Sequence, residues 1–137
     1  MELEELERVI REAAESLDGE DGAWEFEIDG VRMACLTDTH FDRMRIIAPI
    51  VEDQEVTDDQ RREMLEANFH TALDARYATS DGVLYAAFLH PLSALTAELL
   101  ESALDQVVNL VATFGTSYSG GTVVFGVPET KDKRDLN

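Results

Sequence analysis

The segment Asp38-Thr39-His40-Phe41-Asp42 contains residue types that could bind a metal ion. Its two carboxylates and one imidazole stand at alternate positions, and alternate side chains of an extended strand share one face. Both groups are common ligands of divalent metals. A polar stretch between two apolar runs is also typical of a turn, where Asp is frequent. Because no other His or Cys cluster completes a ligand set, we interpret the segment as a turn. We expect no metal site, and metal binding or enzymatic chemistry at Asp38, His40 and Asp42 stays the less favoured alternative.

Four other positions could carry catalytic chemistry. The stretch Gly115-Thr-Ser117-Tyr-Ser119 comes close to the Gly-x-Ser-x-Gly nucleophile motif, but it lacks the last glycine and follows a predicted helix instead of a strand. His70 falls on the polar side of a predicted helix, and His90 stands just before Pro91, so both are read as ordinary surface or loop histidines. Cys35 lies among apolar strand residues and is read as a small core residue. We therefore expect no catalytic residue and no enzyme.

Glycine-rich phosphate-binding motifs are also missing from the sequence: it has neither Gly-x-Gly-x-x-Gly nor Gly-Lys-Ser/Thr. We expect no cofactor.

The charge of the chain is strongly negative, at −18. Twelve of the first thirty residues are acidic, and only Arg8 and Arg11 among them are basic. Such a field repels phosphate backbones and anionic lipid, so nucleic-acid and membrane partners are disfavoured. Two explanations for the acidity stay open: mimicry of nucleic acid by a regulatory binding protein, and adaptation of the whole proteome to a saline habitat.

Length and composition indicate one globular domain in the cytoplasm. With 137 residues and 45% hydrophobic residues, the chain is long enough to bury a core. A single cysteine cannot form an intramolecular disulfide and favours a reducing compartment. The acidic start differs from a secretory signal, and no apolar run reaches membrane-spanning length. We expect one domain over residues 1–127 and a disordered tail over residues 128–137.

The pattern of apolar residues predicts three helices. Helical spacing of Leu3, Leu6 and Ile10 predicts a first helix that continues to Leu17 and is ended by Asp18-Gly19. A capping box at residues 57–60 predicts a second helix whose apolar face includes Met64, Leu65, Asn68, Phe69, Ala72 and Leu73. Thr96 is expected to cap a third helix that reaches about residue 114 and carries a wide apolar stripe.

The strands are predicted from apolar residues at alternate positions. Asp29-Gly30 between two such runs indicates a hairpin. The expected strands cover residues 23–28, 31–36, 43–50, 75–79, 83–89 and, as a short addition, 122–127. Ile47 lies beside Arg43 and Arg45 on the second face of the third strand, which predicts that this face is partly covered. The run 83–89 is apolar on both faces, so we expect it to be central and covered on both sides.

This order of elements resembles the Tir chaperone (CesT-like) family of type III secretion chaperones and the related YbjN-like proteins. The resemblance covers about residues 2–114. Three stretches carry it: the strand Met44-Arg-Ile-Ile-Ala-Pro-Ile50, the helix around residues 64–69, and residues 84–92 leading through residues 94–96 into the last helix. It implies an α+β fold, α-βββ-α-ββ-α, with a twisted antiparallel sheet flanked by helices.

The resemblance also implies function. It implies a homodimer without catalytic activity that binds an extended or partly unfolded segment of a partner protein. Exposed sheet edges and apolar grooves suit that task, because they offer main-chain hydrogen bonds and side-chain pockets. The family has no short binding motif to transfer, so no partner-binding residue is predicted. A chaperone-like protein-binding domain is our leading hypothesis, ahead of the acidic mimic and the metal-binding domain.

Overall fold

The computed structural model describes residues 1–114, which form an α+β domain. The helices are α1 (Leu3–Ala13), α2 (Asp58–His70) and α3 (Ala97–Thr113), with a short 3-10 helix η1 (Asp53–Glu55) before α2. The strands are β1 (Ser16–Glu20), β2 (Ala23–Ile28), β3 (Val31–Asp38), β4 (Arg43–Glu52), β5 (Arg76–Ser80) and β6 (Val83–Pro91). The predicted class and the general order of elements are confirmed.

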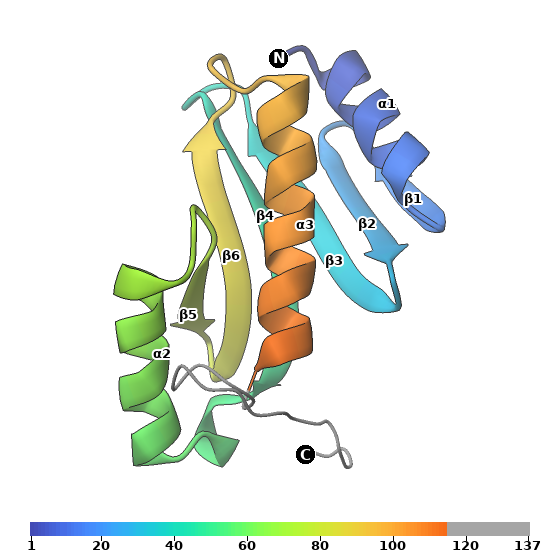
Figure 1. Ribbon diagram of the computed structural model, residues 1–137. Coiled ribbons are helices and arrows are strands. Elements are labelled where there is room, and N and C mark those ends of the chain that lie inside the picture. The colour runs from blue at the N-terminus through green and yellow to red at the C-terminus, as the bar shows by residue number, and fades with distance from the viewer. Residues whose placement is uncertain (115–137) are drawn as a thin grey trace.

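The strands form one sheet in the order β1-β2-β3-β4-β6-β5, in which all neighbours are antiparallel. In Figure 1, α1 and α3 lie on the same face of this sheet, which we call the inner face, and α2 lies beside β5. The opposite, outer face carries no helix in this part of the chain. The core lies between the inner face and the helices, and its fully buried members include Phe26, Ile46, Phe88, Leu6, Ile10, Leu100 and Leu104.

The first helix is shorter than predicted, because the residues after it form a strand. Ala14 already has an extended backbone (φ −93, ψ 152), and β1 pairs with β2 from Ser16 opposite Glu27 to Glu20 opposite Ala23. The prediction that Asp18-Gly19 ends the helix is therefore wrong. The turn uses Asp21-Gly22, with φ values of 57 and 86. Ladder hydrogen bonds to β2 outweigh the helical spacing of Leu17 in this short segment.

The two later helices begin where the sequence predicts. The Thr57 hydroxyl accepts a hydrogen bond from the Gln60 backbone N–H at 3.1 Å, and the Gln60 side chain accepts one from Thr57 N–H at 2.9 Å. This reciprocal pair satisfies two donors that the start of a helix leaves free. At α3, the Thr96 hydroxyl accepts from Leu99 N–H at 3.2 Å.

The outer face is more open than the sequence predicts. β6 lies between β4 and β5, as expected for an internal strand. The prediction that it is covered on both faces is wrong for Leu89, which is 50% exposed. The predicted partial cover of the face that holds Ile47 is confirmed, since Ile47 is half-buried. The reason is the placement of α1 and α3 on the inner face only.

Several predictions concern residues outside the described range. These are the short strand at residues 122–127, the tail at residues 128–137, the segment around Ser117, and the end of the domain predicted over residues 1–127. None of the helices within residues 1–114 has the length and apolar character that a membrane crossing requires.

Candidate partner-binding surfaces

The residues of the candidate metal segment form the turn between β3 and β4. The Asp38 carboxylate accepts a hydrogen bond from Phe41 N–H at 3.1 Å, and the His40 ring packs edge-on against Phe41. Asp42 has a positive φ of 56, and its carboxylate accepts hydrogen bonds from Ser93 N–H and Ser93 O–H, both at 2.7 Å. Both carboxylates thus hold backbone in place. Residues 1–114 contain no group of three or more His, Cys, Asp or Glu side chains that could hold a metal ion.

The electrostatics of that turn follow from the same contacts. The Ser93 hydroxyl and backbone N–H hold the pKa of Asp42 below its usual range, since both donate to the charged carboxylate. Asp42 therefore joins the turn to the segment that leads into α3. These two hydrogen bonds give Asp42 a structural role, because both of its carboxylate oxygens already accept from Ser93.

The other titratable candidates lie apart from one another. His70 is exposed at the end of α2 against Phe69, and His90 stacks on Phe88 at the end of β6, with Nδ1 2.9 Å from the Pro91 carbonyl oxygen. Cys35 is fully buried on β3, and burial raises the pKa of its thiol to about 12. That thiol is neutral at physiological pH and has little nucleophilic character.

An apolar surface is exposed on α2. Leu65, Phe69 and Leu73 are 67%, 82% and 69% exposed. They follow one another at intervals of four along the chain, so the two helical members lie on one side of α2 and Leu73 continues the row just beyond it. We call these three residues the α2 surface. Large apolar side chains grouped in this way on a small protein mark an interaction site.

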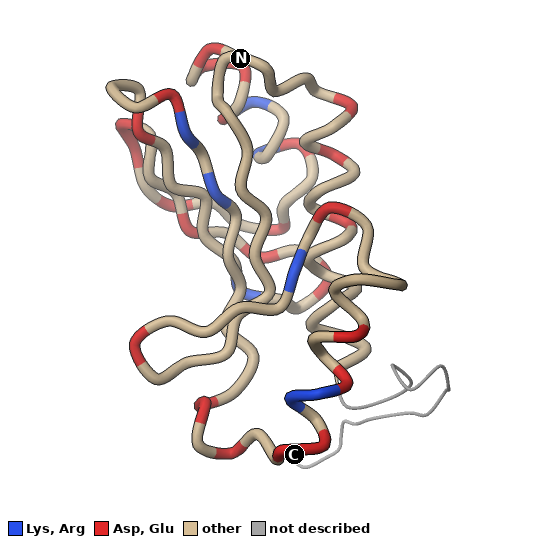
Figure 2. Tube along the Cα trace, turned by 90° about the vertical axis from the view of Figure 1, so that its left-hand side faces the viewer, with Lys and Arg blue, Asp and Glu red and all other residues tan. Residues whose placement is uncertain are grey.

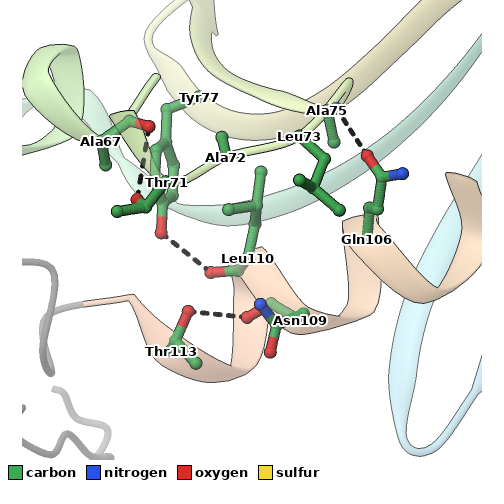
Figure 3. A pocket seen from close by; sticks show the side chains of 10 residues that line it. All are labelled: Ala67, Thr71, Ala72, Leu73, Ala75, Tyr77, Gln106, Asn109, Leu110 and Thr113. Atoms are coloured by element: carbon green, nitrogen blue, oxygen red, sulfur yellow. Dashed lines mark hydrogen bonds between the residues drawn. The ribbon is translucent and has the colours of Figure 1, made fainter. Parts of the chain in front are cut away.

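A hollow of about 360 Å³ lies between α2, β5 and α3, next to the α2 surface. Figure 3 shows its lining: Ala67, Thr71, Ala72, Leu73, Ala75, Tyr77, Gln106, Asn109, Leu110 and Thr113. The Tyr77 hydroxyl donates to the Leu110 carbonyl at 3.2 Å, and burial raises the pKa of this phenol. The Gln106 side chain accepts from Asp74 and Ala75 N–H at 2.8 and 2.9 Å. These bonds join β5 and the segment before it to α3.

The edge of the sheet at β5 is occupied at Tyr77 by a side chain of α2. The Asn68 amide accepts from Tyr77 N–H at 2.9 Å and donates to Tyr77 C=O at 3.1 Å. Asn68 thus satisfies both backbone groups that an added strand would need there. The sequence places Asn68 in the apolar face of the helix but does not reveal this contact.

A second exposed surface lies on the outer face of the sheet. Arg45 stands opposite Leu36 of β3 and Leu89 of β6. These leucines are 40% and 50% exposed, and Phe41 in the adjoining turn is 70% exposed. Leu36, Phe41, Arg43 and Arg45 line a shallow hollow of about 290 Å³. We call Leu36, Phe41, Arg43, Arg45 and Leu89 the outer-face surface.

The acidic side chains are spread over the molecule. Figure 2 shows acidic positions along helices, strands and turns, including α1, the β1–β2 hairpin, α2 and α3. A nucleic-acid mimic needs its acidic groups arranged along one surface like phosphates. The distribution within residues 1–114 does not single out such a surface.

Neither the known protein families nor the curated protein sequences give a match to this chain. Solved structures do. The chain is similar to the structure of the HopA1-SchA chaperone-effector complex, with a TM-score of 0.60 and 14% identity over 82% of this chain and 88% of that chain. It is similar to the ExsC-ExsE complex, with a TM-score of 0.59 and 18% identity over 81% and 92%.

A third similar structure is the Yersinia pestis type III secretion chaperone SycH in complex with a stable fragment of YscM2. Its TM-score is 0.61, with 16% identity over 80% of this chain and 96% of that chain. At these identities the likeness establishes the fold alone. The chain has a type III secretion chaperone-like fold, and a closer relation to CesT-like or YbjN-like proteins stays a prediction.

Sequence reasoning missed both surfaces. For α2 it found the apolar face but gave no sign that this face lacks a cover. For the outer face it found that Ile47, Arg43 and Arg45 share one face of a predicted strand. An arginine on each side of a buried Met44 was the available signal, because charged residues on alternate positions mark a face that meets solvent or a partner.

Proposed function

We propose that this protein is a non-enzymatic, chaperone-like domain that binds an extended or partly unfolded segment of a partner protein in the cytoplasm. One observation carries the proposal: residues 1–114 expose two groups of large apolar side chains, one on α2 and one on the outer face. The fold likeness supports it, because the similar structures are of chaperones or complexes with protein partners.

The proposal includes a homodimer formed through the α2 surface. Leu65, Phe69 and Leu73 form a narrow apolar row, and two copies of such a row can cover each other about a two-fold axis. Self-association would remove three large apolar side chains from water, which favours the dimer. We propose further that residues 1–127 act as one domain and that the protein is related to CesT-like and YbjN-like chaperones.

The test is selection from a phage-displayed library of random protein segments on the immobilised protein. We expect enrichment of segments that contain apolar residues and lack stable structure. A double variant, Leu36→Asp with Leu89→Asp, should lose retention of the segments that bind the outer face. Ser80→Asp, which adds charge at an exposed position of β5, is the matched control and should retain them. Failure to enrich any segment over a bare support would contradict the proposed function.

A further inference from the structure

We propose that the outer-face surface selects an acidic, extended partner segment, one that carries carboxylates at alternate positions next to apolar residues. This inference rests on the proposed function and specifies the chemistry of the partner. It comes from the two arginines of the surface, Arg43 and Arg45, and from the apolar side chains that surround them.

The arginines of this chain are mostly engaged within it. Five form ion pairs with carboxylates of the same chain: Arg8, Arg11, Arg32, Arg61 and Arg62. Arg76 donates hydrogen bonds to the carbonyls of Leu73 and Ala75. Within residues 1–114, only Arg43 and Arg45 have neither an ion pair nor a side-chain hydrogen bond. The chain has 29 acidic and 11 basic residues, and within residues 1–114 these two arginines are the basic side chains without an ion pair or a side-chain hydrogen bond.

The strand register explains why the Arg45 guanidinium has no ion pair. The neighbours of Arg45 across the sheet are Leu36 and Leu89, which have no charge. Arg43 lies opposite Asp38 and Pro91, and the Asp38 carboxylate accepts a hydrogen bond from Phe41 N–H but forms no ion pair with Arg43. Both arginines are exposed and form no ion pair, although Asp38 lines the same hollow and Arg43 helps to lower the pKa of Asp42.

The spacing of the arginines suits an extended peptide. Arg43 and Arg45 are two positions apart on β4, so their side chains leave the same face of the sheet roughly 7 Å apart. An extended segment lying along β4 presents its own alternate side chains at the same interval. Two carboxylates at alternate positions can then each meet one guanidinium, whose planar donors match a carboxylate.

The apolar members of the surface favour protein over other anions. Leu36, Leu89 and Phe41 flank the arginines and can bury apolar side chains of the same segment. Nucleic acid would meet the same arginines, but the net charge of −18 opposes a polyanion along most of its length. Screening at physiological ionic strength, with a Debye length of about 8 Å, leaves the short-range arginine contacts effective against the distant acidic groups.

The experiment compares the segments that the phage library enriches on the wild type with those enriched on Arg43→Gln/Arg45→Gln. We expect Asp and Glu at alternate positions in the wild-type set and loss of this preference on the double variant. Fluorescence anisotropy at physiological salt then measures the affinities of two synthetic peptides from the wild-type set. One has the native sequence, and in the other each Asp or Glu is replaced by Asn or Gln. The native peptide should bind roughly tenfold more tightly to the wild type than to the double variant.

Arg62→Gln is the matched control, because it removes the same charge from an exposed arginine on α2. It should leave the affinity of the acidic peptide unchanged. Enriched segments without carboxylates, equal binding of the amide peptide, or displacement of the acidic peptide by a short single-stranded DNA would each overturn the inference. The first two results leave the proposed function intact, whereas a library with no enriched segment contradicts the proposed function itself.

Discussion

Helices α1 and α2 both have an apolar side in the sequence, but the fold treats them differently. α1 buries Leu6, Val9 and Ile10 against the rest of the domain. α2 buries only Met64 and Ala67 and leaves Leu65 and Phe69 in solvent. The contrast teaches that apolar spacing locates the side of a helix that needs a cover. It does not say whether the same chain supplies that cover or another molecule does.

At their N-termini the order is reversed: α2 has the more complete local hydrogen bonding, although α1 is the more buried helix. α2 has a complete capping box at Thr57 and Gln60, whereas the N-cap of α1, Glu2, makes no side-chain hydrogen bond. α2 is thus defined by its own local sequence, and α1 depends on packing. A helix that exposes apolar residues lacks part of the burial that stabilises most helices, so its local cap matters more.

The largest expected difference concerns a leucine in each helix. Leu6→Ala should lower the free energy of unfolding by about 2–5 kcal/mol, because Leu6 is fully buried and its loss leaves a cavity. Leu65→Ala should change it by about 0.5 kcal/mol or less, since Leu65 already meets water. Urea unfolding followed by circular dichroism gives both values.

Both leucine variants are best made in a Phe69→Asp background, so that self-association through α2 does not add to the measured stability. Similar losses for the two leucines would contradict the assignment of α1 to the core and of the α2 surface to an interface.

The next largest effect concerns the helix starts. Thr57→Ala removes an acceptor for the Gln60 N–H and should cost about 1 kcal/mol. Glu2→Ala, at the corresponding position of α1, removes no capping hydrogen bond and should have little effect. The same unfolding measurement compares them, and an equal cost at both positions would show that α2 does not rely on its local cap.

The smallest effect is confined to acid pH and involves the turn at Asp42, which lies outside both helices. Hydrogen bonds from Ser93 lower the pKa of Asp42 below 3.8 in the folded state. Because the pKa of Asp42 is lower in the folded protein than in the unfolded chain, its charged carboxylate stabilises the fold at pH values above the unfolded pKa. This contribution is lost as the pH falls through the folded pKa. Asp42→Asn should therefore flatten the loss of stability below pH 3.8, as measured by urea unfolding across that range. An unchanged slope would mean that the Ser93 contacts do not persist in solution.

Local signals in the sequence account for much of the fold. Capping at Thr57 and Thr96, the Asp29-Gly30 turn and the alternating strands predict most elements correctly. The strand β1 was missed because its residues also continue the helical pattern of α1. The pair Asp21-Gly22, of the same type as Asp29-Gly30, was the signal that could have revealed it.

The two exposed surfaces could not be predicted in the same way. Their existence depends on which face of the sheet the helices cover, and that is set by the packing of the whole domain. Leu89 belongs to a run that is apolar on both faces, so its exposure becomes visible only once α3 is placed on the inner face. The lack of an ion pair at Arg45 likewise follows from strand register, which brings leucines beside it.

Sedimentation equilibrium tests most directly whether the α2 surface joins two copies of this protein. The wild type should have twice the 15.3 kDa mass of the chain, and Leu89→Asp, on the outer face, should keep that mass. Phe69→Asp should sediment as a folded monomer of 15.3 kDa, because a carboxylate in the apolar row opposes burial. A wild type that stays monomeric at all concentrations, or a Phe69→Asp variant that remains dimeric, would contradict the account.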